Sequence, residues 1–271
     1  MAHDATFKQF IKEFLKDCDI RVNEPVGKLP LAIDLVITCP QGAATGIELP
    51  VFKENFSAIN IVEFKSGRDN PDTSDLPKLL GYVGLYCAQH GIGIDIMDRK
   101  VTAWYISARK PAFIDDLLLK KAFEPTPTTG LYRLLISSLF PCFVLVIDEL
   151  DFAEANLPLL GFGTGEILKK FVVEMNERRL RHELSTELEK HLTTICVVNH
   201  GVLQDMTETK EILPDIFAEN LKLVIQDMGL SKVLELIGTK ETIEALVEKV
   251  GVDEIEKILS EKRQKSKHRR K

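Results

Sequence analysis

Three charged side chains lie inside two short apolar runs of this chain, and their types suit metal-assisted hydrolysis. Asp34 stands in the run Leu31–Ile37, and Glu63 and Lys65 stand in the run Ile59–Lys65. A carboxylate buried without a partner among Leu, Ile and Val side chains costs several kcal/mol, so each acid needs a partner. We expect a divalent metal ion to be that partner.

The predicted ligands of the ion are the carboxylates of Asp34 and Glu63 and the backbone carbonyl of Phe64. Hard oxygen ligands of this kind suit Mg²⁺ or Mn²⁺, which keep positions open for water and for a substrate phosphate. Such an ion polarises the phosphate and lowers the pKa of a bound water. Lys65 would orient that water or offset the negative charge that develops in the transition state.

Strand geometry decides whether these residues can meet. Side chains alternate between the two faces of a strand, so Glu63 and Lys65 share one face. If the two runs pair with their faces aligned, Asp34 and Glu63 come within reach of one ion. The Glu-x-Lys spacing by itself is unspecific, because it recurs at Glu208–Lys210 outside any apolar strand.

The elements around these residues predict an α/β fold. Amphipathic spacing indicates a first helix within residues 7–16, and a turn-rich stretch precedes a helix over residues 76–90 that Gly91 ends. Beyond Thr164 the pattern becomes helical. The predicted strands are residues 19–22, 31–37, 59–65, 101–107, 131–136 and 143–147, and residues 40–56 have room for another short strand.

The order of these residues resembles the PD-(D/E)xK nuclease superfamily. Asp34 in Ile-Asp-Leu-Val, then Glu63-Phe-Lys65, then the helix after them carry the resemblance, which covers roughly residues 5–150. The layout is most similar to bacterial recombination-promoting nucleases and transposase-like proteins. The resemblance implies that Asp34 and Glu63 bind Mg²⁺ or Mn²⁺ and that Lys65 is the catalytic lysine of a DNA endonuclease.

The resemblance implies the fold of the N-terminal part, and the helical and basic patterns beyond it predict the rest of the domain organisation. We expect a restriction-endonuclease-like αβββαβ core with a mixed central sheet over residues 1–157. An all-α C-terminal region would follow over residues 158–261, and a basic tail over residues 262–271.

Three further residues are implied as accessory to the site. Glu13 matches an acid that related nucleases often carry on the first helix, and Tyr82 matches a helix tyrosine of some members. Lys78 stands where those members have glutamine, and Ile33 stands where the motif has proline. Neither departure removes a predicted metal ligand. From the residues alone, Glu13 could instead be a solvated helix acid. Lys78 and Tyr82 could belong to a semi-buried amphipathic stripe of their helix.

The composition is typical of a soluble globular protein. Hydrophobic residues make up 45% of the chain and charged residues 28%, which is too apolar for a disordered protein. No apolar run has the length of a membrane span, and the first residues lack the pattern of a secretory signal. The five scattered cysteines lack metal-binding spacing and predict free thiols in a reducing compartment. We therefore expect a cytoplasmic protein.

Charge is distributed unevenly along the chain. Residues 262–271 carry seven basic side chains and no acid, and removing them from the formal charge of -6 leaves -13 on residues 1–261. The tail could contact nucleic-acid phosphates, fold back on the acidic body, or serve only solubility. Short amphipathic segments near the end predict helices that pack on one another, contact DNA or join copies into a homo-oligomer.

Two functions stay open at this point. The first is a metal-dependent DNA endonuclease linked to recombination or transposition. The second is a catalytically inactive nuclease-like scaffold that binds protein or DNA, which the acidic body supports because many nucleases present a basic face. In the second case Glu63 and Lys65 form an ordinary ion pair, and Asp34 accepts hydrogen bonds at a sheet edge.

Overall fold

The computed structural model of the chain describes residues 2–15, 17–25, 32–39, 49–93, 100–135, 140–228 and 233. The chain divides into two compact units, Met1–Leu168 and Lys169–Lys271. The basic tail and the short helices predicted near the end lie outside the described residues. Of the helices that the structure describes, none combines the length and the low polarity needed to cross a bilayer.

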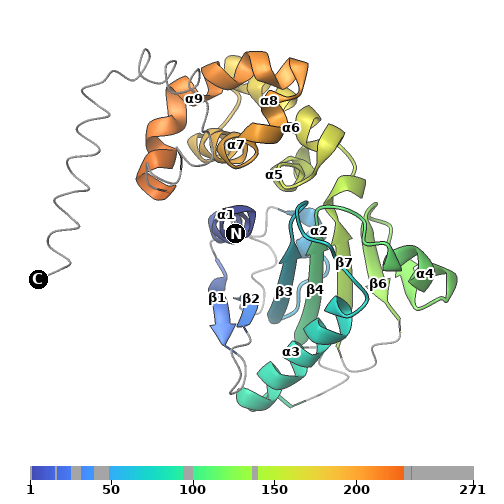
Figure 1. Cartoon of the computed structure of the whole chain (residues 1–271). Coiled ribbons are helices and arrows are strands. Elements are labelled where there is room, and N and C mark those ends of the chain that lie inside the picture. The colour runs from blue at the N-terminus through green and yellow to red at the C-terminus, as the bar shows by residue number, and fades with distance from the viewer. Residues whose placement is uncertain are drawn as a thin grey trace, which may run out of the picture. The chain divides into compact units, whose positions relative to one another are not determined.

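A seven-stranded mixed sheet forms the centre of the first unit (Figure 1). β3 pairs in parallel with β4, and β4 pairs in parallel with β7, whereas the other neighbouring strands are antiparallel. β4 is rich in β-branched and aromatic residues and is buried along its whole length, as a central strand should be. The order is β1 (Asp19–Pro25), β2 (Ala32–Thr38), β3 (Ile59–Lys65), β4 (Val101–Ser107), β7 (Cys142–Val146), β6 (Leu131–Leu134) and β5 (Phe123–Pro125).

Two helices cover one face of the sheet. α3 (Asp75–Gln89) has its apolar residues at helical spacing, and Leu79 and Val83 pack into a cluster with strand side chains of that face. α4 (Phe113–Leu119) adds Phe113 to the same cluster. In Figure 1, α3 runs in front of β3 and β4, and its apolar residues share a cluster with Ile61, on the face of β3 that also carries Glu63 and Lys65.

The opposite face is built on aromatic contacts. The ring of Phe7, from α1 (Ala2–Phe14), stacks on that of Phe64 with 3.9 Å between the centroids. The short helix α2 (Pro50–Lys53) places a phenylalanine ring against the indole of Trp104. Because Phe64 lies between Glu63 and Lys65 and points to the other face, its packing fixes the strand that presents them.

Shorter elements and a helical second unit complete the described chain. In the second unit α7 packs against α9, and the hydroxyl of Ser185 caps α7 by accepting the N–H of Leu188 at 3.3 Å. The remaining bounds are η2 (Ile147–Glu149), η3 (Glu154–Asn156), α5 (Leu157–Leu160), α6 (Gly165–Leu180), α7 (Thr186–Val198), α8 (His200–Gln204) and α9 (Thr207–Met228).

The sequence prediction of an α/β fold with a mixed sheet is confirmed, whereas a restriction-endonuclease-like core stays a prediction. Within residues 40–56, the part that the structure describes forms α2 and no strand, because Pro50 starts a helical turn there. The strand β5 was not predicted from the sequence; it has three residues and pairs only with β6 at the sheet edge. β7 ends one residue before the predicted boundary, because Ile147 already belongs to η2.

Candidate active site

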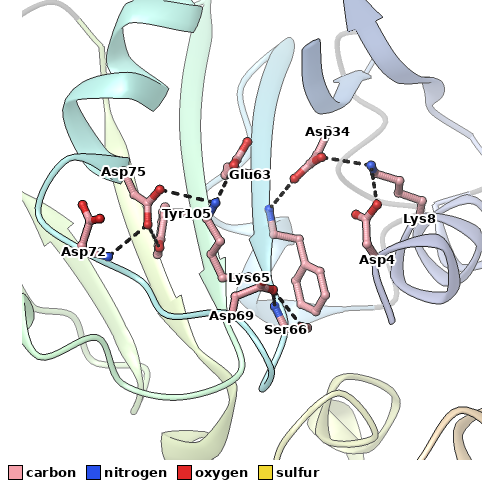
Figure 2. A network of polar contacts seen from close by, with 11 residues as sticks. Asp4, Lys8, Asp34, Glu63, Lys65, Ser66, Asp69, Asp72, Asp75 and Tyr105 are labelled. Atoms are coloured by element: carbon pink, nitrogen blue, oxygen red, sulfur yellow. Dashed lines mark hydrogen bonds and ion pairs between the residues drawn. The ribbon is translucent and has the colours of Figure 1, made fainter. Parts of the chain in front are cut away.

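The pairing of β2 with β3 brings Asp34 beside Glu63. Leu35 lies opposite Val62, and the same antiparallel register continued by one residue places Asp34 opposite Glu63. The backbone pairing of β2 with β3 ends at this point, and Oδ2 of Asp34 accepts the N–H of Phe64 at 3.1 Å instead (Figure 2).

This hydrogen bond also tells where the carbonyl of Phe64 points. In an extended strand, the N–H and the C=O of one residue point toward the same strand edge. Since the N–H of Phe64 points to Asp34, its carbonyl also points to the β2 side of β3. The predicted oxygen donors, on Asp34, Glu63 and Phe64, therefore border the place where the two strands separate.

Glu63 is a buried acid, and its charged neighbours have opposite effects on its pKa. It is 9% exposed, and its Oε1 lies 2.9 Å from Nζ of Lys65. Burial, together with the negative charge of Asp34, raises the pKa of Glu63, while Lys65 and Lys78 act against that rise. The two carboxylates among the predicted metal ligands are thus close enough to repel each other, and a cation near both would relieve the repulsion.

Lys65 lies between two carboxylates. Its Nζ is 2.9 Å from Oε1 of Glu63 and 3.4 Å from Oδ1 of Asp75. Burial alone would lower the pKa of Lys65, but the hydrogen bonds and charges of the two acids outweigh it and the pKa is raised. Lys65 is therefore held as an ammonium ion, which donates hydrogen bonds and supplies positive charge.

Asp75 is a member of the site that the sequence analysis missed. Its Oδ2 accepts the hydroxyl of Tyr105 at 3.1 Å and the backbone N–H of Asp72 at 3.1 Å (Figure 2). Tyr105 lies opposite Glu63 in the parallel β3–β4 pair, and burial, followed by the charge of Asp75, raises its pKa. The available signal was an acid in the first turn of a helix, which ordinarily indicates only a favourable helix end.

Lys8, from α1, holds Asp34 on its other side and was also missed. Its Nζ lies 2.9 Å from a carboxylate oxygen of Asp34, from one of Asp4 and from Oδ1 of Asn23. Burial would lower the pKa of Lys8, but the hydrogen bonds and charges of the two acids raise it. A lysine on an amphipathic helix usually faces solvent, and so its sequence position gave no sign of this role.

The three predicted accessory residues differ in placement. Lys78 is exposed on α3, with its Nζ 5.5 Å from the centre of the buried Tyr82 ring, and its charge acts on Glu63. Glu13 accepts a hydrogen bond of 2.9 Å from Gln9 on its own helix. The α1 acid that is linked to Asp34, through Lys8, is Asp4.

The donor types and the charge of the site fit a hard divalent cation. Two ammonium groups face four carboxylates, so the fully ionised network has an excess of two negative charges. Among the described residues, no three His, Cys, Asp or Glu side chains gather as a metal site. The donors proposed here are two carboxylates and one carbonyl, a set that suits Mg²⁺ or Mn²⁺. The members of the network are Asp4, Lys8, Asp34, Glu63, Lys65 and Asp75.

Comparisons of the chain with protein-family models, with curated proteins and with solved structures found no match. The resemblance to the PD-(D/E)xK superfamily therefore rests on Asp34, Glu63 and Lys65, on their order along the chain and on the helix that follows them. Any function has to be argued from the chemistry of these residues.

Proposed function

We propose that this protein is a metal-dependent DNA endonuclease that hydrolyses phosphodiester bonds at the Asp34–Glu63–Lys65 site. The observation that carries the proposal is the contact of Asp34 with β3: its carboxylate accepts the N–H of Phe64 at 3.1 Å, beside Glu63, whose Oε1 lies 2.9 Å from the ammonium group of Lys65. A Mg²⁺ or Mn²⁺ ion bound there would supply a Lewis acid for the phosphate and lower the pKa of a water.

Each residue of the chain has a definite task in this proposal. Asp34, Glu63 and the carbonyl of Phe64 hold the ion. Lys65, kept protonated by its two acids, donates a hydrogen bond to the attacking water or to a phosphate oxygen and offsets the charge that builds on the phosphate. Lys78 is the exposed cation near Glu63 that can contact the DNA backbone.

DNA is the proposed substrate because of the resemblance and the basic tail. Seven basic side chains in residues 262–271 can neutralise phosphates, which the acidic remainder of the chain would otherwise repel. We propose a role in recombination or transposition on the resemblance alone, with homo-oligomers formed through the C-terminal helices.

The direct test is cleavage of supercoiled plasmid by the purified chain. We expect nicked circles in the presence of Mg²⁺ or Mn²⁺ and intact plasmid when EDTA is present. The matched control is Asp34→Asn, purified in the same way, because the amide keeps the size of the carboxylate and loses its charge. Equal nicking by the variant and the parent would assign the activity to a contaminant and remove the proposal.

A specific observation supports the second candidate, a non-catalytic scaffold. Lys8 pairs with Asp34 and Lys65 pairs with Glu63, both at 2.9 Å, so each of the two predicted carboxylate ligands already has a cation. A site neutralised in this way can persist without any metal. The scaffold function predicts no cleavage with any divalent ion, and no rise in melting temperature when Mn²⁺ is added.

Asp75 should act as a positioning residue for Lys65. Asp75→Asn keeps an oxygen that can accept the Tyr105 hydroxyl but loses the charge that holds the ammonium group. We expect the rate of nicking at saturating DNA to fall about tenfold, about 1.4 kcal/mol in activation free energy, with a much smaller change in KM.

The matched control for Asp75 is Asp72→Asn in the same turn, whose exposed side chain accepts the N–H of Ser74 and has no ion pair with Lys65 among the contacts the structure gives. It should leave the rate near that of the parent. Equal losses in the two variants would show that the turn as a whole matters, and would remove the specific role of Asp75.

A further inference from the structure

We propose that Cys18 and Cys39 form a redox-active thiol pair that closes into a disulfide between β1 and β2 when the protein meets a peroxide. The two residues lie just before β1 and just after β2, respectively. Cys39 is five positions beyond Asp34 along the chain, and the proposal does not depend on the nuclease function. Both thiols are free in the structure.

The strand register places the two cysteines opposite each other. Asp19 lies opposite Thr38, and the same antiparallel register continued by one residue pairs Cys18 with Cys39. The N–H of Cys39 donates to the carbonyl of Ala58 at 2.8 Å, on the β3 side, so the backbone polar groups of Cys39 point away from β1. Cys39 therefore occupies a position that is not hydrogen-bonded toward β1.

Such a pair has the geometry that a disulfide needs. Residues opposed at non-hydrogen-bonded positions of an antiparallel pair have Cα atoms about 4.5 Å apart and side chains that approach closely. Disulfides join Cα atoms about 4.4–6.8 Å apart. A bond between Cys18 and Cys39 is therefore compatible with this register. Cys18 is also close enough to Cys39 to contribute to the raised pKa of the Cys39 thiol.

The two thiols differ in exposure, and we assign them different roles for this reason. Cys18 is partly exposed, whereas Cys39 is 6% exposed. Burial, and then the contact with Cys18, raises the pKa of Cys39. Cys18 is therefore the sulfur that a small oxidant reaches first, and Cys39 is the neighbour that resolves the product. The remaining cysteines are buried in other elements: Cys87 in α3, Cys142 in β7 and Cys196 in α7.

The reaction balances with hydrogen peroxide as the oxidant. The thiolate of Cys18 attacks one peroxide oxygen and breaks the O–O bond, which gives a sulfenic acid and, after protonation of the leaving hydroxide, water. The sulfur of Cys39 then attacks the sulfur of Cys18, and its proton leaves with the displaced hydroxyl as a second water. Two thiols and one peroxide thus become one disulfide and two waters, with two electrons passed from sulfur to oxygen.

Peptide mapping of the full-length protein tests the pair. Reduced protein is treated with hydrogen peroxide, alkylated, and digested with trypsin without a reductant. Cleavage after Lys16, Arg21, Lys28 and Lys53 leaves Cys18 on residues 17–21 and Cys39 on residues 29–53. We expect a single cross-linked product of these two peptides, with a mass two hydrogens below their sum, which separates again on reduction.

Matched variants decide the outcome. Cys18→Ala, at the partly exposed position, should abolish the cross-link, while Cys87→Ala should retain it in full. The oxidised parent should also melt at a higher temperature than the reduced parent, because the bond restrains the unfolded chain, and Cys18→Ala should show no such rise. Peroxide that carries Cys18 to sulfinic acid, or leaves it free for alkylation, in the folded parent would overturn the proposal.

Discussion

Replacing Lys65 with alanine should lower the rate of plasmid nicking by about 10²- to 10⁴-fold while metal binding persists. Lys65 has its ammonium group 2.9 Å from Glu63, on the face that Glu63 shares, and it is not among the proposed ligands. Its loss removes a hydrogen-bond donor and a positive charge where the transition state gains negative charge. The ion itself would still be held by Asp34, Glu63 and the carbonyl of Phe64.

Two measurements separate the effect of a substitution on the rate of cleavage from its effect on metal binding. Single-turnover nicking at saturating Mn²⁺ reports the chemical step, and the rise in melting temperature on adding Mn²⁺ reports binding of the ion. Lys65→Ala should lose the first and keep or enlarge the second, because the ammonium group beside Glu63 also repels the ion, whereas Asp34→Asn should lose both. Lys53→Ala, which removes an exposed lysine of α2, should keep both. A Lys65→Ala protein that nicks like the parent would rule out the proposed role of Lys65.

The sequence was informative where local rules set the structure. The alternation of side chains along Ile59–Lys65 predicted that Glu63 and Lys65 share a face of the strand. In the structure, Nζ of Lys65 lies 2.9 Å from Oε1 of Glu63. The apolar run around Asp34 predicted a strand, and β2 covers it from Ala32 onward. These features follow from a period of two within one segment, and so a short stretch of sequence contains them.

The partners of the site depend on packing between distant segments, which no local pattern determines. Lys8 reaches Asp34 across 26 positions only because Phe7, its neighbour on α1, stacks on Phe64 of β3. From the sequence, Lys8 looked like one of several solvent-facing helix lysines. Which turn of α1 approaches the sheet is likewise set by this packing, so the sequence pattern of the helix did not indicate that Asp4 would pair with Lys8.

The contact between Asp75 and Tyr105 could not be predicted from the sequence for a related reason. Their hydrogen bond joins the first turn of α3 to the middle of β4, across 30 positions. The sequence predicted both elements, but not the alignment of the helix with the strand. The β3–β4 register, which places Tyr105 opposite Glu63, is a parallel pairing between segments that a helix separates, and hydrophobic content alone leaves such a register open.

Replacing Lys8 with methionine should destabilise the protein and at the same time strengthen its binding of a divalent ion. The ammonium group of Lys8, with its side chain 8% exposed, neutralises Asp4 and Asp34. Removing it leaves these acids without a counter-charge, at a cost of about 2 kcal/mol in the free energy of unfolding. The cost lies below that of a fully buried pair because the Asp34 and Asp4 side chains remain 23% and 41% exposed.

The same substitution frees Oδ1 of Asp34 and removes a positive charge that repels the ion. We expect Mn²⁺ to bind about tenfold more tightly, which corresponds to about 1.4 kcal/mol, and to restore much of the lost stability. Urea unfolding with and without Mn²⁺ measures both effects. Lys12→Met, at an exposed position of the same helix, is the control and should change neither.

The result for Lys8→Met also distinguishes the two candidate functions. If Asp34 and Glu63 are metal ligands, the loss of Lys8 exposes a site with stronger negative charge, and Mn²⁺ must stabilise the variant more than the parent. If Lys8 and Lys65 are instead the permanent partners of these acids in an inactive scaffold, the variant is destabilised and Mn²⁺ does not rescue it. Rescue in the variant together with a plasmid that stays intact would place metal binding, without cleavage, at the junction of β2 and β3.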